Sequence, residues 1–464
     1  MTFRARMEQG LVVFDGAMGT MLQRHMAPGA LPETLNLTHP EAVTAVHLAY
    51  LNAGADVVET NTLNANRIKV EKTGHRVDEV IRAAVLCAQK AVEQSGKEGY
   101  VALSMGSLGV MIEPLGDLPF DEAYDIYAEM ARAGEQAGAD LILIETVTDL
   151  HEIKAALMAA KQQTKLPVAV TLTFFANGKL LTGADVATSV AVIEALGADI
   201  IGLNCGLGPK QMLGLADELR AATSLPILIN PNAGLPKLVD GESVYAVAPD
   251  EFSDDDALLV QKGARLIGGC CGTTPAHIRA LKRRIVGVEA PRSSEKDMTY
   301  IASGSKSVAF VDNPVLIADI SEDDLDDMTD NALEAEAEVV MVAYHPLVEA
   351  VQALQEVVLK PMYLVAQTPE EAEAALRLYN GKPLLGVADA ENLNPYIRIA
   401  KEGGAALAVG AEALYAPAAQ VLGAKNVFVD CGADAELSAR LSARGVRTVL
   451  HSDADASARV VREN

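Results

Sequence analysis

Three of the five cysteines stand in settings that suit a metal ion. Cys205 precedes a glycine, and Cys270 and Cys271 are flanked by Gly269 and Gly272. Thiolates are soft ligands, and zinc in enzymes is often held by three protein side chains with one position left open. Glycines permit the backbone angles that aim two adjacent thiols at one ion. We therefore predict that Cys205, Cys270 and Cys271 bind zinc and that this zinc site is catalytic.

The other two cysteines, Cys87 and Cys431, have no such setting. We expect each of them to be a small buried hydrophobic residue. An odd and sparse cysteine count in a long chain also argues against a disulfide framework and leaves metal or catalytic roles open.

The elements that position these residues form a regular alternation. Over roughly the first 285 residues, short β-branched runs alternate with longer stretches of helical periodicity, which is the pattern of a (β/α)8 TIM barrel. The predicted strands are residues 11–14, 57–59, 101–104, 141–144, 167–171, 200–203, 225–229 and 264–267, and helices are predicted at 40–51, 77–93, 120–137 and 149–162.

Acidic, amide, hydroxyl and glycine residues follow these predicted strands. Barrel enzymes carry their active sites at the carboxyl ends of the strands, so these residues are expected to gather at one mouth. The positions concerned are Asp15, Gly16, Ala17, Asn61, Ser107, Glu145, Asn204, Asn232, Ala233 and Gly234, together with the three cysteines. His277 lies on the helix after the last strand and is expected to be structural.

The second half of the chain is predicted to be a separate α/β domain. A segment rich in proline, serine and charged residues at 286–298 reads as a linker. We therefore expect two domains, a (β/α)8 barrel at residues 1–286 and a smaller barrel-like α/β domain at 299–464. The strands predicted in the second domain are residues 315–320, 339–343, 362–365, 384–387, 406–409, 427–429 and 447–450.

The composition excludes some partners. With 38 basic and 63 acidic residues, the net charge is −25. Such a surface repels nucleic acid and anionic membranes, so neither is expected as a partner. No apolar run approaches the about 20 residues that a membrane helix needs, and the short apolar stretch near the N-terminus is not a signal-peptide core. The chain is expected to be cytoplasmic.

Five motifs together resemble the homocysteine S-methyltransferase family. The resemblance covers roughly residues 8–285, in order and without large gaps, and within the family it is greatest to the homocysteine module of cobalamin-dependent methionine synthases. The motifs are Asp-Gly-Ala-Met-Gly-Thr at 15–20, Glu-Thr-Asn-Thr at 59–62, Gly-Leu-Asn-Cys-Gly at 202–206, Pro-Asn-Ala-Gly-Leu-Pro at 231–236 and Gly-Gly-Cys-Cys-Gly-Thr-Thr-Pro-Ala-His-Ile at 268–278.

This resemblance implies zinc-dependent transfer of a methyl group to the thiol of homocysteine, which gives methionine. It assigns zinc to the three cysteines, and it assigns the ammonium group of homocysteine to Asp15 and Glu145. The backbone of Gly16 and Ala17, and that of Asn232, Ala233 and Gly234, is expected to bind the substrate carboxylate. Asn61, Ser107 and Asn204 are expected to brace these loops through hydrogen bonds.

The methyl donor is less defined by the sequence. Betaine-dependent relatives carry a tyrosine after the strand-four acid, where this chain has Thr146. The second half only faintly resembles a pterin-binding barrel, because Val365-Ala366-Gln367 replaces an acidic element after the third strand. No Asp-x-His-x-x-Gly motif for cobalamin occurs. We therefore expect a methyl-corrinoid on a separate protein, with S-methylmethionine or methyl-folate as alternative donors. A non-catalytic, zinc-containing assembly barrel is the alternative from another class.

Overall fold

The computed structural model describes the chain except residues 27–28, 240–241, 292–295, 297–298, 311–314, 323, 388–392 and 454–464. Packing divides the chain into two compact units. The first comprises Met1–Leu181 and Ala198–Glu295, and the second comprises Thr182–Gly197 and Lys296–Asn464. The short segment Thr182–Gly197 thus packs with the second unit although it lies between two strands of the first, a feature that the predicted domain limits of 286 and 299 did not include.

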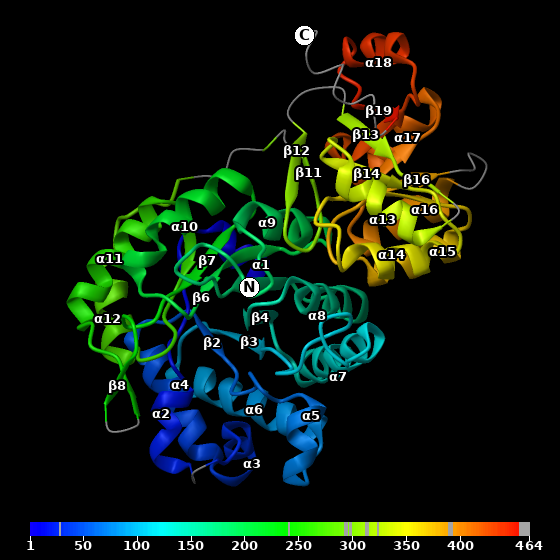
Figure 1. The fold of residues 1–464 in the computed structure, drawn as a ribbon. Helices are drawn as coiled ribbons and strands as arrows, with labels where there is room; N and C mark the ends of the chain where they lie inside the picture. Colours follow the sequence, from blue (N-terminus) through cyan, green and yellow to red (C-terminus); the bar gives the residue numbers. More distant parts are fainter. Residues whose placement is uncertain are drawn as a thin grey trace. The chain divides into compact units, whose positions relative to one another are not determined.

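The first unit is a nearly closed, parallel, eight-stranded barrel (Figure 1). Its strands pair in the order β1-β10-β7-β6-β5-β4-β3-β2, and a parallel bridge between Phe14 and Val57 joins the first strand to the second. The predicted TIM barrel is confirmed. Its strands are β1 (Val12–Val13), β2 (Val57–Glu59), β3 (Tyr100–Met105), β4 (Leu141–Val147), β5 (Val168–Leu172), β6 (Ile200–Asn204), β7 (Ile227–Asn230) and β10 (Ala264–Ile267).

Helices connect the strands of this barrel, and none of the described helices has the length and hydropathy to cross a membrane. They are α1 (Phe3–Glu8), α2 (Gly19–Leu22), α3 (Leu35–Thr38), α4 (Pro40–Ala53), α5 (Arg67–Val70), α6 (Val77–Ser95), α7 (Phe120–Ala137), α8 (Leu150–Gln163), α9 (Val186–Ala195), α10 (Pro209–Ala222), α11 (Pro249–Gln261) and α12 (Pro275–Arg284), with short 3-10 turns at Gln23–His25, Pro32–Thr34 and Glu71–Thr73.

The helix ends follow from local sequence. Pro40 occupies the first turn of α4, where its missing N–H costs nothing, and Gly54 ends the helix at φ 114°. The side chain of Asp149 caps α8 by accepting from the N–H of His151. These residues end one helix and begin another, and the parallel pairing of the strands places their carboxyl ends at the same mouth.

The interior of the first barrel is apolar towards the amino ends of its strands. Phe3 of α1 packs edge-on against Tyr100, with ring centroids 5.6 Å apart, and joins a buried cluster inside the barrel. Fully burying one such side chain contributes about 1.5–3 kcal/mol. The cluster contains Phe3, Val12, Phe14, Val57, Tyr100, Ala102, Leu141, Leu143, Ala169, Ile200, Leu228 and Leu266. This cluster fills the barrel interior below the carboxyl ends of the strands with apolar side chains.

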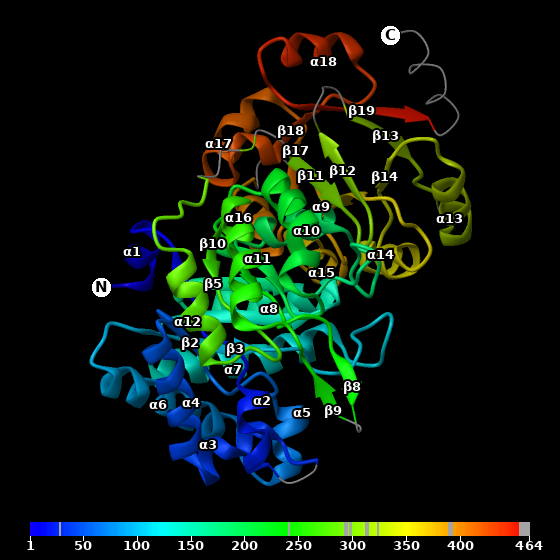
Figure 2. The same ribbon diagram turned by 90° about the vertical axis from the view of Figure 1, so that its left-hand side faces the viewer.

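An insertion that the sequence did not predict follows β7. Strands β8 (Lys237–Val239) and β9 (Glu242–Val244) pair antiparallel. Figure 2 shows this hairpin standing out from the barrel. The chain returns from it through Tyr245 to α11, across the mouth of the barrel where the cysteines lie.

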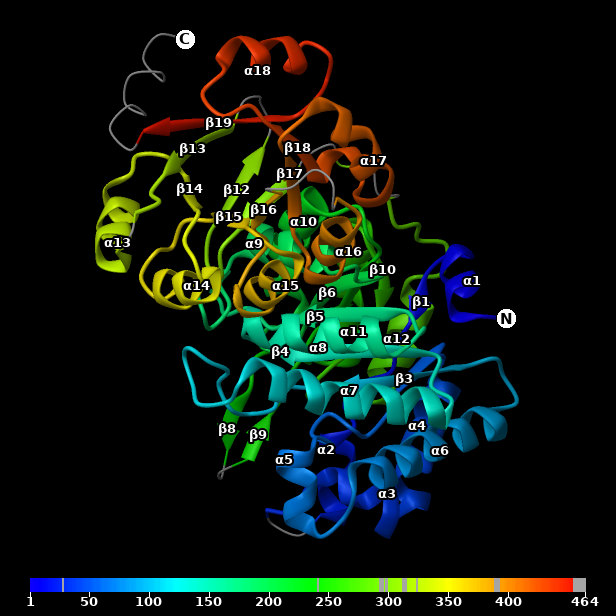
Figure 3. The ribbon, with the colours of Figure 1, turned by 90° about the vertical axis from the view of Figure 1, so that its right-hand side faces the viewer.

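The second unit is a closed barrel of seven parallel strands, β13 to β19 (Figure 3). The prediction of a second, smaller α/β barrel-like domain is confirmed. Its elements are β13 (Val315–Asp319), α13 (Leu325–Glu334), β14 (Val339–Val342), α14 (Leu347–Gln355), β15 (Met362–Ala366), α15 (Pro369–Leu378), β16 (Leu384–Val387), α16 (Leu393–Gly403), β17 (Ala406–Val409), α17 (Glu412–Leu422), a 3-10 turn (Ala424–Asn426), β18 (Val427–Asp430), α18 (Ala435–Ser442) and β19 (Thr448–Asp453).

A second antiparallel hairpin precedes this barrel, and the sequence did not predict it. It consists of β11 (Thr299–Ala302) and β12 (Ser307–Phe310). Phe310 packs edge-on against Phe428, and Ala302 bridges to Lys382 just before β16. The hairpin therefore closes the amino end of the second barrel with apolar side chains.

Candidate metal and substrate site

The three predicted cysteines meet at the mouth of the first barrel. Cys205 follows β6 and the pair Cys270 and Cys271 follows β10, and these two strands both pair with β7. The three Sγ atoms all lie within 4.8 Å of one another, and those of Cys205 and Cys271 are 3.8 Å apart. Tetrahedral zinc with Zn–S bonds near 2.3 Å places sulfurs about 3.8 Å apart. The cluster thus has the donor set and spacing for one zinc ion.

Two non-glycine residues among the described part of the chain have a positive φ, and both lie at this mouth. They are Cys205 at φ 54° and Thr146 at φ 59°. A left-handed conformation is costly for a residue with a side chain, above all a β-branched one, and such strain tends to persist at functional sites. The β4–β5 pairing shifts register between Ile144 and Val147, which re-aims Glu145 and Thr146. The backbone here is adapted to aim side chains.

The thiols of the cluster share protons. The S–H groups of Cys205 and Cys270 donate to Cys271 and lower the pKa of that thiol to about 3. The pKa of Cys270 is raised well above its usual value, first by its hydrogen bond with Cys205 and then by the one with Cys271. One sulfur therefore ionises readily without any metal, and a cation would draw protons from the other two.

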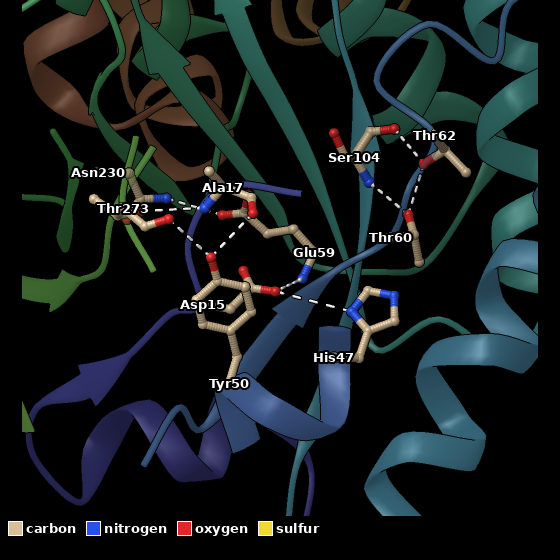
Figure 4. A network of polar contacts seen from close by, with 10 residues as sticks. All are labelled: Asp15, Ala17, His47, Tyr50, Glu59, Thr60, Thr62, Ser104, Asn230 and Thr273. Carbon is tan, nitrogen blue, oxygen red and sulfur yellow. Dashed lines mark hydrogen bonds and ion pairs between the residues drawn. The ribbon is translucent and has the colours of Figure 1, made fainter. Parts of the chain in front are cut away.

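Three carboxyl groups lie at the same mouth; Asp15 and Glu145 are buried, and Glu59 is half-buried. Asp15 follows β1, Glu59 ends β2 and Glu145 lies in β4. The N–H of Glu59 donates to Oδ2 of Asp15 at 3.1 Å, and Nδ2 of Asn230 donates to Oε1 of Glu59 at 2.9 Å (Figure 4). Hydrogen bonds from strands β2 and β7 thus hold Asp15 and Glu59 in place.

Glu145 is fixed by two neighbours. Asn204 donates through Nδ2 to Oε2 of Glu145 at 3.0 Å, and the hydroxyl of Ser104 donates to Oε1. Asn204 also accepts from the N–H of Thr146 at 3.0 Å, so it supports the strained residue beside the acid. Because Asn204 directly precedes Cys205, one short segment positions both a metal ligand and the acid.

The pocket has a deficit of positive charge. Burial raises the pKa of Asp15 and Glu59 well above their usual values and that of Glu145 to about 7, and the acids repel one another. His47 lies 4.0 Å from Oδ2 of Asp15, but burial lowers its pKa to about 3, so it is neutral. Oδ1 of Asp15 has no hydrogen-bond partner among the described residues. The site is therefore suited to a cation that donates hydrogen bonds, as an ammonium group does.

The unbalanced acids predict that the protein releases protons when an ammonium group binds. With a pKa of about 7, about half of the Glu145 carboxyls carry a proton at pH 7. A bound ammonium favours the ionised form and lowers that pKa, so the proton leaves. Calorimetry in buffers of different ionisation enthalpy should show wild type releasing about half a proton more per homocysteine than Glu145→Gln. Equal release by the two proteins would contradict the assignment of Glu145.

Four of the five backbone amides predicted for the substrate carboxylate already have acceptors. The N–H of Ala17 donates to Thr273, that of Asn232 to Leu207 O and that of Ala233 to Cys271 O. The N–H of Gly234 likewise donates to Asn232 O at 2.7 Å. Carboxylate binding by these amides needs the bonds to rearrange or to be shared, and it stays a prediction.

Asn61 and Ser107 make loop contacts. Nδ2 of Asn61 donates to Pro32 O at 2.9 Å and to Oδ1 of Asn36 at 3.1 Å. The hydroxyl of Ser107 donates to Glu152 at 2.9 Å. Both residues connect a strand-end loop to a neighbouring element of the same barrel. Their bracing role stays a prediction.

Several residues of the site were missed in the sequence. Glu59 is the last residue of β2, and Asp15 follows β1. Because both acids lie at strand ends, this position could have identified Glu59 as a site residue from the sequence. Tyr50 on α4 donates to Ala17 O at 3.0 Å and to Thr273 O at 3.1 Å, joining the first and last loops (Figure 4). Gly16 is packed so tightly that an added Cβ would lie 2.5 Å from the Thr273 hydroxyl. No local pattern indicates such contacts.

Comparison with known proteins places the first barrel among methyl-transfer proteins. The sequence model of the homocysteine S-methyltransferase family matches residues 12–285. The methionine synthase of Mycobacterium tuberculosis is 33% identical over 317 residues, which is 64% of this chain and 26% of that protein. The chain thus spans about a quarter of the length of the curated relatives it matches.

Solved structures of the homocysteine methyltransferase MmuM from Escherichia coli share this fold. The oxidized form is 25% identical, with a TM-score of 0.51, covering 61% of this chain and 98% of that one. The metallated form has a TM-score of 0.52 at 24% identity and covers 61% and 99% of the two chains. The matched portion has the size of one barrel of this chain.

Proposed function

This chain belongs to the homocysteine S-methyltransferase family, and we propose that its first barrel holds zinc through Cys205, Cys270 and Cys271 and transfers a methyl group to the thiol of homocysteine. The proposal is supported by one observation: the three cysteine thiols lie beside a pocket whose acids suit a bound cation. Homocysteine carries a thiol and an ammonium group on one short chain. Asn204 directly precedes Cys205 and donates a hydrogen bond to Glu145. This segment therefore links the thiol cluster to the pocket proposed for the ammonium group.

The zinc ion and the side chains of the protein would have separate roles in the reaction. Zinc, when bound, would keep the substrate sulfur as a thiolate at neutral pH, which is the nucleophilic form. The residues of the chain orient the substrate: Asp15 and Glu145 bind the ammonium, with Glu59 beside them. Methyl transfer is an in-line displacement, so fixing the acceptor in one orientation supplies much of the rate.

For the methyl donor, we propose a methyl-corrinoid on a separate protein. The similarity to methionine synthase supports it, and residues 1–464 contain no Asp-x-His-x-x-Gly motif. The test is methionine formation from homocysteine with methylcobalamin, methyl-folate or S-methylmethionine as donor. We expect methionine with methylcobalamin. A zinc-loaded protein that forms no methionine with any donor would instead favour a non-catalytic assembly barrel.

The second barrel is proposed to be a degenerate relative of pterin-binding barrels. Its third strand, β15, ends at Ala366 and is followed by Gln367, so no acid follows it. An acid inside the mouth comes instead from β18, where Asp430 accepts from the Tyr363 hydroxyl at 2.6 Å and pairs with His451 at 3.0 Å. Asp430 is therefore already engaged and is not free to pair with a pterin ring.

We accordingly expect no tight methyl-folate binding. A buried pterin with unpaired donors loses about 1–3 kcal/mol per group, so two or three such losses would move a micromolar affinity to millimolar. Titrating the full chain with methyl-folate by calorimetry tests this. Micromolar binding that is lost in Asp430→Ala would contradict the prediction and make the second barrel a folate module.

A further inference from the structure

His47 of helix α4 is fully buried beside the pocket proposed for the ammonium group, and the proposed chemistry does not use it. Its Nδ1 lies 4.0 Å from Oδ2 of Asp15 and points toward that carboxyl group (Figure 4). Neither nitrogen of the ring has a hydrogen-bond partner among the residues that the structure describes. Because an unpartnered buried polar group costs free energy, His47 has a donor to spare for Asp15.

Helix α4 is anchored to the loop that carries Asp15. Tyr50 lies three residues after His47, and its hydroxyl donates to Ala17 O at 3.0 Å and to Thr273 O at 3.1 Å. Residues three apart lie on the same face of a helix. One face of α4 therefore places both side chains against this loop, and the bonds of Tyr50 hold the helix at a fixed distance from it.

The two oxygens of Asp15 have different surroundings. Oδ2 accepts from the N–H of Glu59 at 3.1 Å and faces His47, whereas Oδ1 has no partner in the described part of the chain. A hydrogen bond from Nδ1 to Oδ2 needs these atoms to approach by about 1 Å, which is within reach of a small rotation of the carboxyl group. With two donors on Oδ2, Oδ1 is the oxygen that is left to accept from an ammonium group.

A neutral donor suits this position better than a basic side chain. Burial lowers the pKa of His47, so its ring carries one N–H and no charge. If that proton were on Nε2, the lone pair of Nδ1 would face the oxygen of Asp15, so an ionised Asp15 favours the proton on Nδ1. Because the imidazole is neutral, the carboxylate keeps its full negative charge for the ammonium group of the ligand.

We propose that His47 is a positioning residue, whose Nδ1–H donates to Oδ2 of the ionised Asp15 and thereby directs Oδ1 toward the ammonium group of homocysteine. This inference rests on the proposed homocysteine site. It confines the contribution of His47 to one part of the ligand: the ammonium group depends on it, and the thiol and the carboxylate do not.

The test compares His47→Leu with His47→Asn. Leucine and asparagine have nearly the same shape, and the amide nitrogen of asparagine can take the place of Nδ1. In a third variant, His47→Gln, the amide nitrogen takes the place of Nε2 and leaves Nδ1 unreplaced. Calorimetry on the zinc-loaded proteins measures the affinity for homocysteine and for γ-mercaptobutyrate, which keeps the thiol and the carboxylate and lacks the ammonium group.

In His47→Leu and His47→Gln we expect homocysteine to bind about tenfold more weakly, because a hydrogen bond to a charged group is lost. The affinity for γ-mercaptobutyrate should match that of wild type, and His47→Asn should bind homocysteine within about threefold of wild type. A merely structural role of His47 would weaken the binding of both ligands alike. If His47→Leu fails to fold, the His47→Asn and His47→Gln proteins make the same comparison.

Three results would overturn the role of His47: wild-type affinity for homocysteine in His47→Leu, equal weakening of both ligands, or a His47→Asn protein that binds homocysteine no more tightly than His47→Gln. A wild-type protein that does not bind homocysteine would instead reject the proposed function, and the role of His47 with it. The two failures are therefore distinguished by the wild-type titration alone.

Discussion

Replacing Cys270 by alanine is expected to abolish zinc binding and to lower methionine formation by at least about a hundredfold. Changes to residues that merely support metal ligands already cost about 10- to 100-fold, so losing one of three ligands should cost more. The Cys205→Ala and Cys271→Ala proteins should behave alike, because the three sulfurs lie within 4.8 Å of one another. Metal content by mass spectrometry and methionine formation are the two measurements.

Cys87→Ala is the matched control for these variants. Cys87 is buried on α6 and its sulfur lies 3.6 Å from Pro40 O, away from the three-cysteine cluster. This variant should keep about one zinc ion per chain. Full zinc retention in Cys270→Ala would rule the metal assignment out, whatever the activity.

The second large effect is expected on substrate affinity. Glu145→Gln and Asp15→Asn should keep zinc but bind homocysteine about ten- to a hundredfold more weakly. A hydrogen bond to a charged group is worth about 1.5–3 kcal/mol. Both acids are buried at the mouth, and His47, which lies 4.0 Å from Asp15, is neutral because burial lowers its pKa. Calorimetric titration of the zinc-loaded proteins with homocysteine measures the change.

Asp140→Asn provides the control for charge loss at the other end of the barrel. Asp140 accepts from the N–H of Val101 at 2.8 Å, at the amino end of β3. Its replacement should leave homocysteine affinity unchanged. If both pocket variants also bound homocysteine as wild type does, Asp15 and Glu145 would not be the ammonium site.

The barrel strands could be predicted because their sequences are short β-branched runs between glycine-capped helices. The residues at β2, 57–59, match the prediction, and Gly54 before it adopts the left-handed conformation expected of a helix cap. The β8–β9 and β11–β12 hairpins, with strands of three or four residues, were missed. Their pairing depends on the barrels beside them rather than on a strong local pattern.

The site was predictable to the extent that strand ends share one mouth. That rule brought Cys205 together with Cys270 and Cys271 across more than sixty residues of sequence. The rule could not show which of these groups already have hydrogen-bond or packing partners. The bond from Asn230 to Glu59 joins residues 171 apart, and the approach of Tyr245 to Gly272 depends on an insertion. Such contacts are set by tertiary packing, which a single sequence does not display.

The most direct test of the account is zinc K-edge X-ray absorption of the protein with and without homocysteine. The account predicts three sulfur ligands and one lighter ligand in the free protein, and four sulfurs near 2.3 Å once homocysteine is added. That change would place the substrate thiol on the ion held by Cys205, Cys270 and Cys271. A zinc shell that stays at three sulfurs under saturating homocysteine would contradict the central claim.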